Sequence, residues 1–120
     1  MSDLIYGIGT DICSISRLEQ SLIVTPELKQ RLFHSNELEL RPASLAARFA
    51  AKEALAKALG DPRMLSWNEI EIVKDELGKP SFQLHGNSEE KLRSLGDLRL
   101  HLSLSHDGDV AIATVVLESN

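Results

Sequence analysis

Residues 48–60 read RFAAKEALAKALG, and this stretch organises the fold expected for the chain. It holds five alanines and two leucines, contains no proline or β-branched residue, and ends on Gly60, a residue type that often terminates helices. Pro42 is tolerated in the first turn of a helix and therefore marks the start. The pattern predicts one long helix over residues 43–59.

One face of this helix carries charged side chains. Glu53 and Lys57 are four residues apart and lie on the same face, with Lys52 beside them. Such a pair is commonly a solvated ion pair that stabilises a surface helix. The alternative is a carboxylate and two ammonium groups that belong to a functional site. The stretch by itself favours the ion pair.

Length and composition are typical of one globular domain. The chain has 120 residues, of which 42% are hydrophobic and 26% charged, and we expect a single domain over residues 1–120. No apolar run is long enough to span a bilayer, and the N-terminus lacks the basic and apolar regions of a signal peptide. The single cysteine, Cys13, cannot form an internal disulfide, so we expect a cytoplasmic protein.

Charge is distributed unevenly along the chain. The net charge of −5 argues against general nucleic-acid binding. Residues 29–63 hold seven bases and four acids, a net charge of +3, whereas the remaining residues carry −8. This segment is expected to present a positive surface to an anionic partner or substrate, unless its bases point in different directions and form no patch.

Hydrophobic periodicity and turn residues predict the other elements. Strands are expected at residues 4–12, 69–74, 81–85, 98–105 and 110–117, and short helices at residues 14–23, 26–33, 36–40 and 89–95. Asn36 and Glu39 resemble a capping box, and residues 106–109 are predicted to form the last turn. The last strand is almost entirely apolar and should be central. The fold class is therefore α+β, a single domain with an antiparallel sheet packed against one long helix and several short helices.

Asp11 closes the first predicted strand, which also contains Gly7 and Gly9. Glycines inside a strand often mark the close approach of another backbone. A carboxylate at the end of a buried strand is costly unless it has a partner or a cation. Asp11 is therefore either a ligand or the N-cap of the next helix, and the residue types alone leave both possibilities open.

Three positions become candidates for chemistry when they are taken together: Asp11, Glu53, and His106 with Asp107 at the last turn. Two carboxylates from different elements suit Mg²⁺, which takes oxygen ligands and leaves positions for water and phosphate. Nearby lysines would neutralise phosphate oxygens, and a histidine can accept a proton or orient a phosphate. The set indicates Mg²⁺-dependent phosphoryl or nucleotidyl-type transfer, although an isolated turn histidine is more often an ordinary surface residue. No function is expected for the other histidines: His34, His85 and His101.

Four sequence blocks resemble those of the holo-acyl-carrier-protein synthases, the small phosphopantetheinyl transferases. The blocks occur in the family order and spacing and cover almost the whole chain, with the weakest match over residues 22–47. The blocks are GIGTDI at 7–12 followed by Arg17, RFAAKEA at 48–54 with Lys57 and Gly60, ELGKP at 76–80, and LSHD at 104–107.

The resemblance implies the 4′-phosphopantetheinyl transferase fold and its reaction. The 4′-phosphopantetheine moiety of coenzyme A would be transferred to a serine of apo-acyl carrier protein, for fatty acid biosynthesis, with release of adenosine 3′,5′-bisphosphate. Asp11 and Glu53 would hold Mg²⁺, and His106, Asp107 or a metal-oriented water would act as the base. The resemblance implies catalytic roles for Glu53, Lys57, His106 and Asp107. It also implies that coenzyme A contacts Lys52, Lys57, Gly60, Ser105 and His106.

The same resemblance implies partners. Arg17, Arg41 and Arg48 would receive the acidic carrier protein, and the chain would form a homotrimer with active sites between subunits. No membrane or nucleic acid is expected to bind. Two alternatives are a non-catalytic scaffold that binds coenzyme A or a carrier protein, and a broader-specificity transferase. The paired acids count against the scaffold, and the short chain counts against the broader enzyme.

Overall fold

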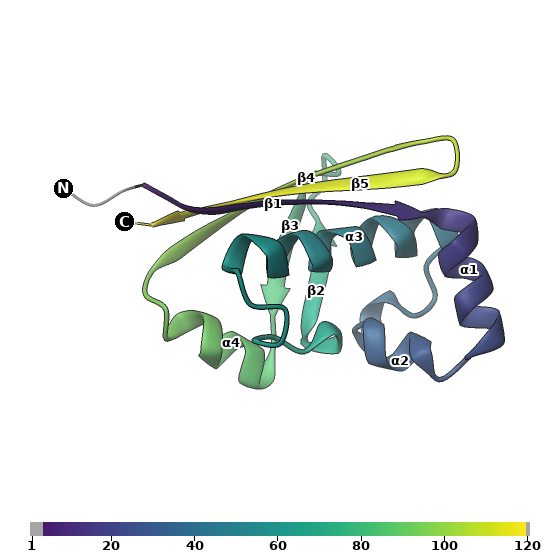
Figure 1. Ribbon diagram of the computed structural model, residues 1–120, viewed down its shortest axis with the longest axis horizontal. Coiled ribbons are helices and arrows are strands. Elements are labelled where there is room, and N and C mark those ends of the chain that lie inside the picture. The colour runs from purple at the N-terminus through teal and green to yellow at the C-terminus, as the bar shows by residue number, and fades with distance from the viewer. Residues whose placement is uncertain (1–3, 120) are drawn as a thin grey trace.

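A long helix, α3 (Pro42–Leu59), lies along one face of a three-stranded antiparallel sheet (Figure 1). The computed structural model describes residues 4–119. The strand order is β1 (Ile5–Ser14), β5 (Val110–Ser119), β4 (Leu98–Asp107), so the apolar last strand is central, as predicted. The predicted α+β class with antiparallel pairing around one long helix is confirmed.

Shorter elements complete the structure. Helices α1 and α2 lie at one end of the molecule and α4 at the other, while β2 and β3 form a separate antiparallel hairpin (Figure 1). Within residues 4–119, no helix is both long and apolar enough to cross a membrane. The bounds are α1 (Ile15–Val24), α2 (Leu28–Leu32), β2 (Ile70–Lys74), β3 (Pro80–Leu84), α4 (Gly86–Arg93) and the 3₁₀ turns η1 (Ser35–Glu37) and η2 (Trp67–Glu69).

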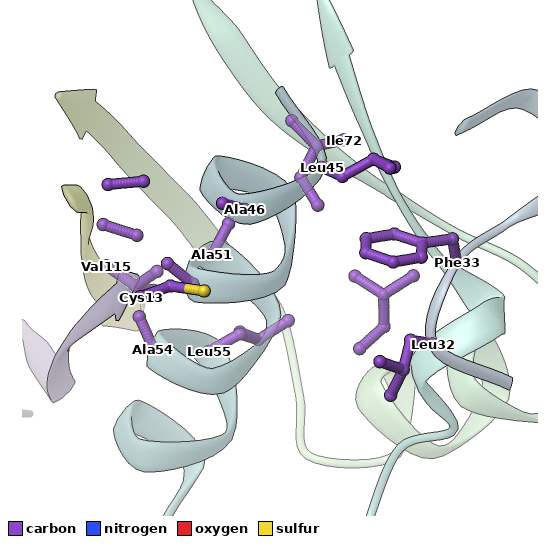
Figure 2. Close-up of a cluster of buried hydrophobic side chains, with 14 of the residues drawn as sticks. Cys13, Leu32, Phe33, Leu45, Ala46, Ala51, Ala54, Leu55, Ile72 and Val115 are labelled. Carbon is purple, nitrogen blue, oxygen red and sulfur yellow. The ribbon is translucent and has the colours of Figure 1, made fainter. Parts of the chain in front are cut away.

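Small residues allow α3 to lie between two apolar layers. Alternate residues of β5 are buried, in the period-2 pattern of a strand with one face on the core. Figure 2 shows Cys13 and Val115 on one side of α3, and Phe33 and Ile72 on the other. The helix is therefore buried on two sides, which explains its many alanines. The fully covered alanines of α3 are Ala46, Ala50, Ala51 and Ala54.

Strand β1 approaches α3 most closely at two glycines. A Cβ atom built on Gly9 would overlap the backbone carbonyl oxygen of Ala54, and one built on Gly7 would overlap that of Ala58. Both obstacles are helix backbone, which cannot yield as a flexible side chain would, so only glycine fits. The close approach predicted from these glycines is confirmed, and its partner is the long helix.

Two details before α3 differ from the predictions. The capping box is formed by His34 and Glu37, not by Asn36 and Glu39: His34 Nδ1 accepts from the Asn36 amide at 3.1 Å, and Glu37 Oε1 accepts from the His34 amide at 3.0 Å. Glu39 is exposed instead. Helix α2 begins two residues later than predicted, because the backbone turns at residues 25–26 before the helix starts.

The last turn is also tighter than predicted. His106 pairs with Ala111 and Asp107 with Val110, so β4 continues to Asp107 and His106 lies in a strand. Gly108 has a positive φ of 57°, which a two-residue hairpin turn requires. The turn is confined to Gly108 and Asp109 because the cross-strand ladder extends further than the leucine alternation indicated.

Replacing Gly9 by alanine should force β1 away from α3. The added methyl group overlaps the Ala54 carbonyl, so the free energy of unfolding should fall by about 3 kcal/mol or more, the upper range for overpacked sites. Urea unfolding followed by circular dichroism measures the change. Gly96→Ala is the control, since its Cβ meets no atom of the described part of the chain within 4 Å and carries only the strain of φ 111°, roughly 1–2 kcal/mol. Equal losses in both variants would contradict the tight contact.

Candidate active site

Asp11 and Lys57 meet where β1 passes over α3. Asp11 pairs with Ala113 of β5, whose side chain is on the buried face of the sheet, so Asp11 is directed to the helix side. Lys57 Nζ donates to Asp11 Oδ1 at 3.0 Å and to the Thr10 carbonyl oxygen at 2.9 Å. Lys57 is thus hydrogen-bonded to the strand, and the interpretation of Glu53 and Lys57 as a self-contained surface pair is wrong.

Glu53 lies one helical turn before Lys57, close enough to Asp11 for their charges to interact. Burial raises the pKa of the Glu53 carboxyl above its ordinary value, the negative charge of Asp11 raises it further, and Lys57 opposes the shift. Burial likewise raises the pKa of the neighbouring Cys13 thiol, with smaller contributions from Asp11 and Glu53. Two carboxylates from different elements therefore converge here with their charge only partly compensated.

This pair of carboxylates fits Mg²⁺ by its chemistry. The ion prefers oxygen ligands and commonly uses one or two protein carboxylates. Burial first and the charge of Asp11 second raise the pKa of Glu53, and a divalent cation would offset both effects. The alternative role for Asp11, the N-cap of α1, is wrong, because Ser14 Oγ accepts from the Arg17 amide at 3.3 Å and occupies the capping position.

A second group of polar side chains lines a cavity of about 130 Å³ beside β4. Arg48 from α3 and Lys74 from β2 bring positive charge to it, next to Ser105 and His106. Arg48 is only 8% exposed, and its Nε, which lies 3.9 Å from Glu37 Oε2, has no hydrogen-bond partner among residues 4–119. A cavity lined by two cationic side chains is suited to an anionic group.

The two groups lie at opposite edges of the sheet. Asp11 is on β1 and His106 is on β4, and β5 separates the two strands. Asp11, Glu53 and Lys57 therefore meet within one chain, whereas His106 does not join them. Asp107 is exposed at the end of β4, near the hairpin turn.

Lys52 does not belong to either group, contrary to the prediction that it contacts coenzyme A. Its side chain is fully buried, and Nζ donates to Leu32 O at 2.8 Å, Glu37 Oε1 at 2.7 Å and Trp67 O at 3.0 Å. These three bonds use every donor of an ammonium group. Adjacent positions on a helix point about 100° apart, so Lys52 faces η1 and η2 while Glu53 faces β1.

The remaining predicted residues are scattered. Gly60 is the C-cap of α3, with φ 81°, and Arg17 and Arg41 are exposed on α1 and before α3. The burial of Arg48 leaves little of it for a docking protein, so the expectation that it contacts the carrier is not supported by its position. The bases of residues 29–63 point in several directions, as Lys52 and Arg41 illustrate.

Two residues at these sites were not predicted. Lys74 reaches the β4 cavity from a hairpin whose position beside β4 no local pattern reveals. Asp109 accepts hydrogen bonds from Ser14 Oγ at 2.9 Å and from Ser16 Oγ at 2.6 Å, and thereby fixes the junction of β1 and α1 beside Asp11. Asp109 was predicted only as a turn residue, because the pairing of the first and last strands is not visible in the sequence.

The raised pKa of Glu53 predicts a pH-dependent effect of Glu53→Gln without metal. Ionised Glu53 is destabilising, so wild-type stability should be lost as pH rises from the ordinary value of 4.5 through the raised pKa. The variant, which has no such ionisation, should therefore gain in relative stability over the same range. Urea unfolding at several pH values tests this against Glu39→Gln, an exposed glutamate with no expected effect. A constant difference across pH would contradict the raised pKa of Glu53.

Known proteins resemble this chain over nearly its full length. The family profile of the 4′-phosphopantetheinyl transferase superfamily matches residues 7–115. The holo-[acyl-carrier-protein] synthase of Clavibacter michiganensis subsp. michiganensis is 48% identical over 117 residues, which cover 98% of both chains. That of Clostridium novyi is 46% identical over 122 residues and covers 96% of this chain and 88% of the relative.

Solved structures agree with the sequence comparison. The crystal structure of holo-[acyl-carrier-protein] synthase from Neisseria meningitidis has a TM-score of 0.89 at 37% identity and covers 97% of this chain and 100% of its own. The Bacillus anthracis enzyme, in complex with CoA (3′,5′-ADP), has a TM-score of 0.80 at 34% identity and covers 98% of this chain and 100% of its own. The chain belongs to the 4′-phosphopantetheinyl transferase superfamily, as one of its holo-acyl-carrier-protein synthases.

Proposed function

We propose that Asp11 and Glu53 hold a Mg²⁺ ion where this enzyme transfers 4′-phosphopantetheine from coenzyme A to a serine of apo-acyl carrier protein. The supporting observation is that two carboxylates from β1 and α3 converge, with burial and the charge of Asp11 raising the pKa of Glu53. Bound Mg²⁺ supplies positive charge that polarises the pyrophosphate and offsets charge on the leaving adenosine 3′,5′-bisphosphate. The product, holo-carrier protein, serves fatty acid biosynthesis.

Lys57 supplies a fixed positive charge at this site. Its side chain is 55% exposed, yet Nζ is oriented by Asp11 and the Thr10 carbonyl. An ammonium group held in place next to the carboxylates can donate hydrogen bonds to phosphate oxygens without first being reoriented. Lys57 therefore has the exposure for substrate contact that Lys52 lacks.

The cavity beside β4 binds a further phosphate of coenzyme A in this proposal. Arg48 and Lys74 supply the charge, and Ser105 and His106 supply hydrogen-bonding groups at its rim. Both Arg48 and Lys74 carry a positive charge, which favours an anionic phosphate in this cavity. This assignment moves Arg48 from contact with the carrier protein to the cavity proposed for coenzyme A.

A homotrimer joins the two half-sites. One chain offers carboxylates at the β1 edge and another offers the cationic cavity at its β4 edge, so a complete site needs a head-to-tail interface, which closes into a ring. The outer face of the sheet supports association, because Ile8 and Ile12 are each 64% exposed and Ile112 is 41% exposed. In this arrangement the base is His106 or Asp107 of a neighbouring chain, or a metal-oriented water.

The carrier protein docks on α1 and the start of α3. An apolar groove of about 350 Å³ lies there, with Leu18, Leu22 and Lys29 among its lining residues. Arg17 and Arg41 are exposed on the same elements and can pair with an acidic surface. We place the reaction in the cytoplasm, which suits an unpaired cysteine.

Glu53→Gln should remove most of the transfer activity while leaving the fold intact. With Mg²⁺, coenzyme A and apo-carrier protein, the wild-type chain should increase the mass of the carrier by one phosphopantetheine at its serine. The variant should be slower by roughly 100-fold or more, the usual effect of removing a group that stabilises developing charge. Glu39→Gln is the control and should react normally. Normal turnover by Glu53→Gln would exclude Glu53 as a metal ligand, and a stable complex without modification would support a scaffold.

Ile112→Glu should disrupt the trimer. The substitution places a charge on the outer face of β5, so the mass measured by light scattering should fall from three chains to one, and transfer should be lost with it. Leu77→Glu is the control, since Leu77 is 95% exposed at the hairpin tip. A fully active monomer would contradict the shared site.

A further inference from the structure

Two histidines and a glutamate form a cluster separate from the candidate active site. His34 precedes η1, Glu71 lies on β2 and His85 follows β3. One ligand atom from each of the three lies within 4.8 Å of the others. Their sequence neighbours Phe33 and Ile72 lie on the side of α3 opposite Cys13, which adjoins the candidate active site (Figure 2).

We propose that His34, Glu71 and His85 bind one Zn²⁺ ion per chain. Two imidazole nitrogens and one carboxylate oxygen are a known ligand set for this metal, with water completing the coordination. Glu71 Oε1 is 2.9 Å from His85 Nε2 and 3.7 Å from His34 Nδ1. An ion beside Oε1 would thus have all three ligand atoms within reach after small side-chain adjustments.

The carboxylate is already oriented for this role. Asn36 Nδ2 donates to Glu71 Oε2 at 3.1 Å, which leaves Oε1 directed at the histidines. Burial raises the pKa of the Glu71 carboxyl, but hydrogen bonds from His85 and Asn36, and the charge of the two imidazoles when they are protonated, outweigh it, so the net shift is downward. Glu71 is therefore ionised near neutral pH, as a metal ligand must be.

His34 already has the tautomer that binding a metal through Nδ1 requires. His34 Nδ1 accepts from the Asn36 amide at 3.1 Å, so its lone pair is free of a proton and the hydrogen is on Nε2. Metal binding would exchange this hydrogen bond for a coordinate bond. His85 Nε2 donates to Glu71 in the metal-free chain, and its proton would be carried by Nδ1 instead when the metal is bound.

The rings need one adjustment. His34 and His85 are stacked, with centroids 4.3 Å apart and planes inclined by 19°. Because ligating lone pairs lie in the ring planes, one ring must tilt before both can bind a single ion. The His85 side chain is 34% exposed and can tilt, and the same opening gives water and metal access.

Charge favours a nitrogen-seeking metal over Mg²⁺ here. The buried charged residues nearby balance one another, since Glu37 and Glu71 are matched by Arg48 and Lys52. A hard cation therefore gains little net attraction, whereas Zn²⁺ gains bonds to imidazole. This distinguishes the cluster from the pair of oxygen ligands formed by Asp11 and Glu53.

Calorimetric titration of the full chain with Zn²⁺ tests the proposal. The wild-type chain should bind one ion, and His85→Gln and His34→Asn should each bind at least about tenfold more weakly, since each removes a ligand. The variants preserve local contacts, because glutamine can donate to Glu71 and asparagine can accept from the Asn36 amide. His101→Asn is the matched control, a histidine that pairs with Glu118 on the sheet and should have no effect.

Two further measurements decide ambiguous results. Glu53→Gln should retain Zn²⁺ binding. If this variant lost Zn²⁺ binding while the histidine variants kept it, the proposal would be overturned and the ion assigned to the active-site carboxylates. In the wild-type chain, Zn²⁺ should shift the imidazole NMR signals of His34 and His85 and leave those of His101 unchanged. Absence of binding, or binding that the histidine variants leave intact, would show that the cluster is only a hydrogen-bonded network.

Discussion

The contact between β1 and the backbone of α3 is the constraint on which the site depends. Gly7 and Gly9 let the strand lie directly on helix carbonyls, and any larger residue would hold the two apart. The same closeness brings Asp11 within hydrogen-bonding distance of Lys57 and within charge range of Glu53. Two residues without side chains thus determine where the side chains that carry the chemistry meet.

Helix α3 separates two electrostatic environments. On the β1 side, Asp11 and Glu53 leave negative charge only partly compensated. On the side of η1 and β2, buried acids and bases are matched. The cationic cavity lies at the other edge of the sheet, so one chain contains two incomplete half-sites. This division explains why an enzyme this small depends on association for a complete site in the proposed mechanism.

The sequence predicted those features that depend on local periodicity or on one residue type. Residues 43–59 form the expected helix because propensity and packing agree, and the glycines at positions 7 and 9 indicated the close contact. The role of Lys52 was wrong, because no local pattern shows which side of a helix buried on two sides will face solvent. The cluster of His34, Glu71 and His85 was not predicted, because its residues come from three segments that are distant in the sequence and meet only in the folded chain.

The buried carboxylate of Glu37 has a consequence for how the chain reaches its final state. It accepts from the nearby His34 amide and from two distant donors, Lys52 Nζ and the Ile72 amide at 2.9 Å, so η1, α3 and β2 are joined at one carboxylate. Any arrangement in which one segment is misplaced leaves an unpaired charge out of water, at a cost of several kcal/mol. Partly docked states, in which the carboxylate lacks one of its donors, are therefore less stable than the native state. The hydrogen bonds of Glu37 thus favour the state in which the α2–η1 segment, the hairpin and α3 are all in place.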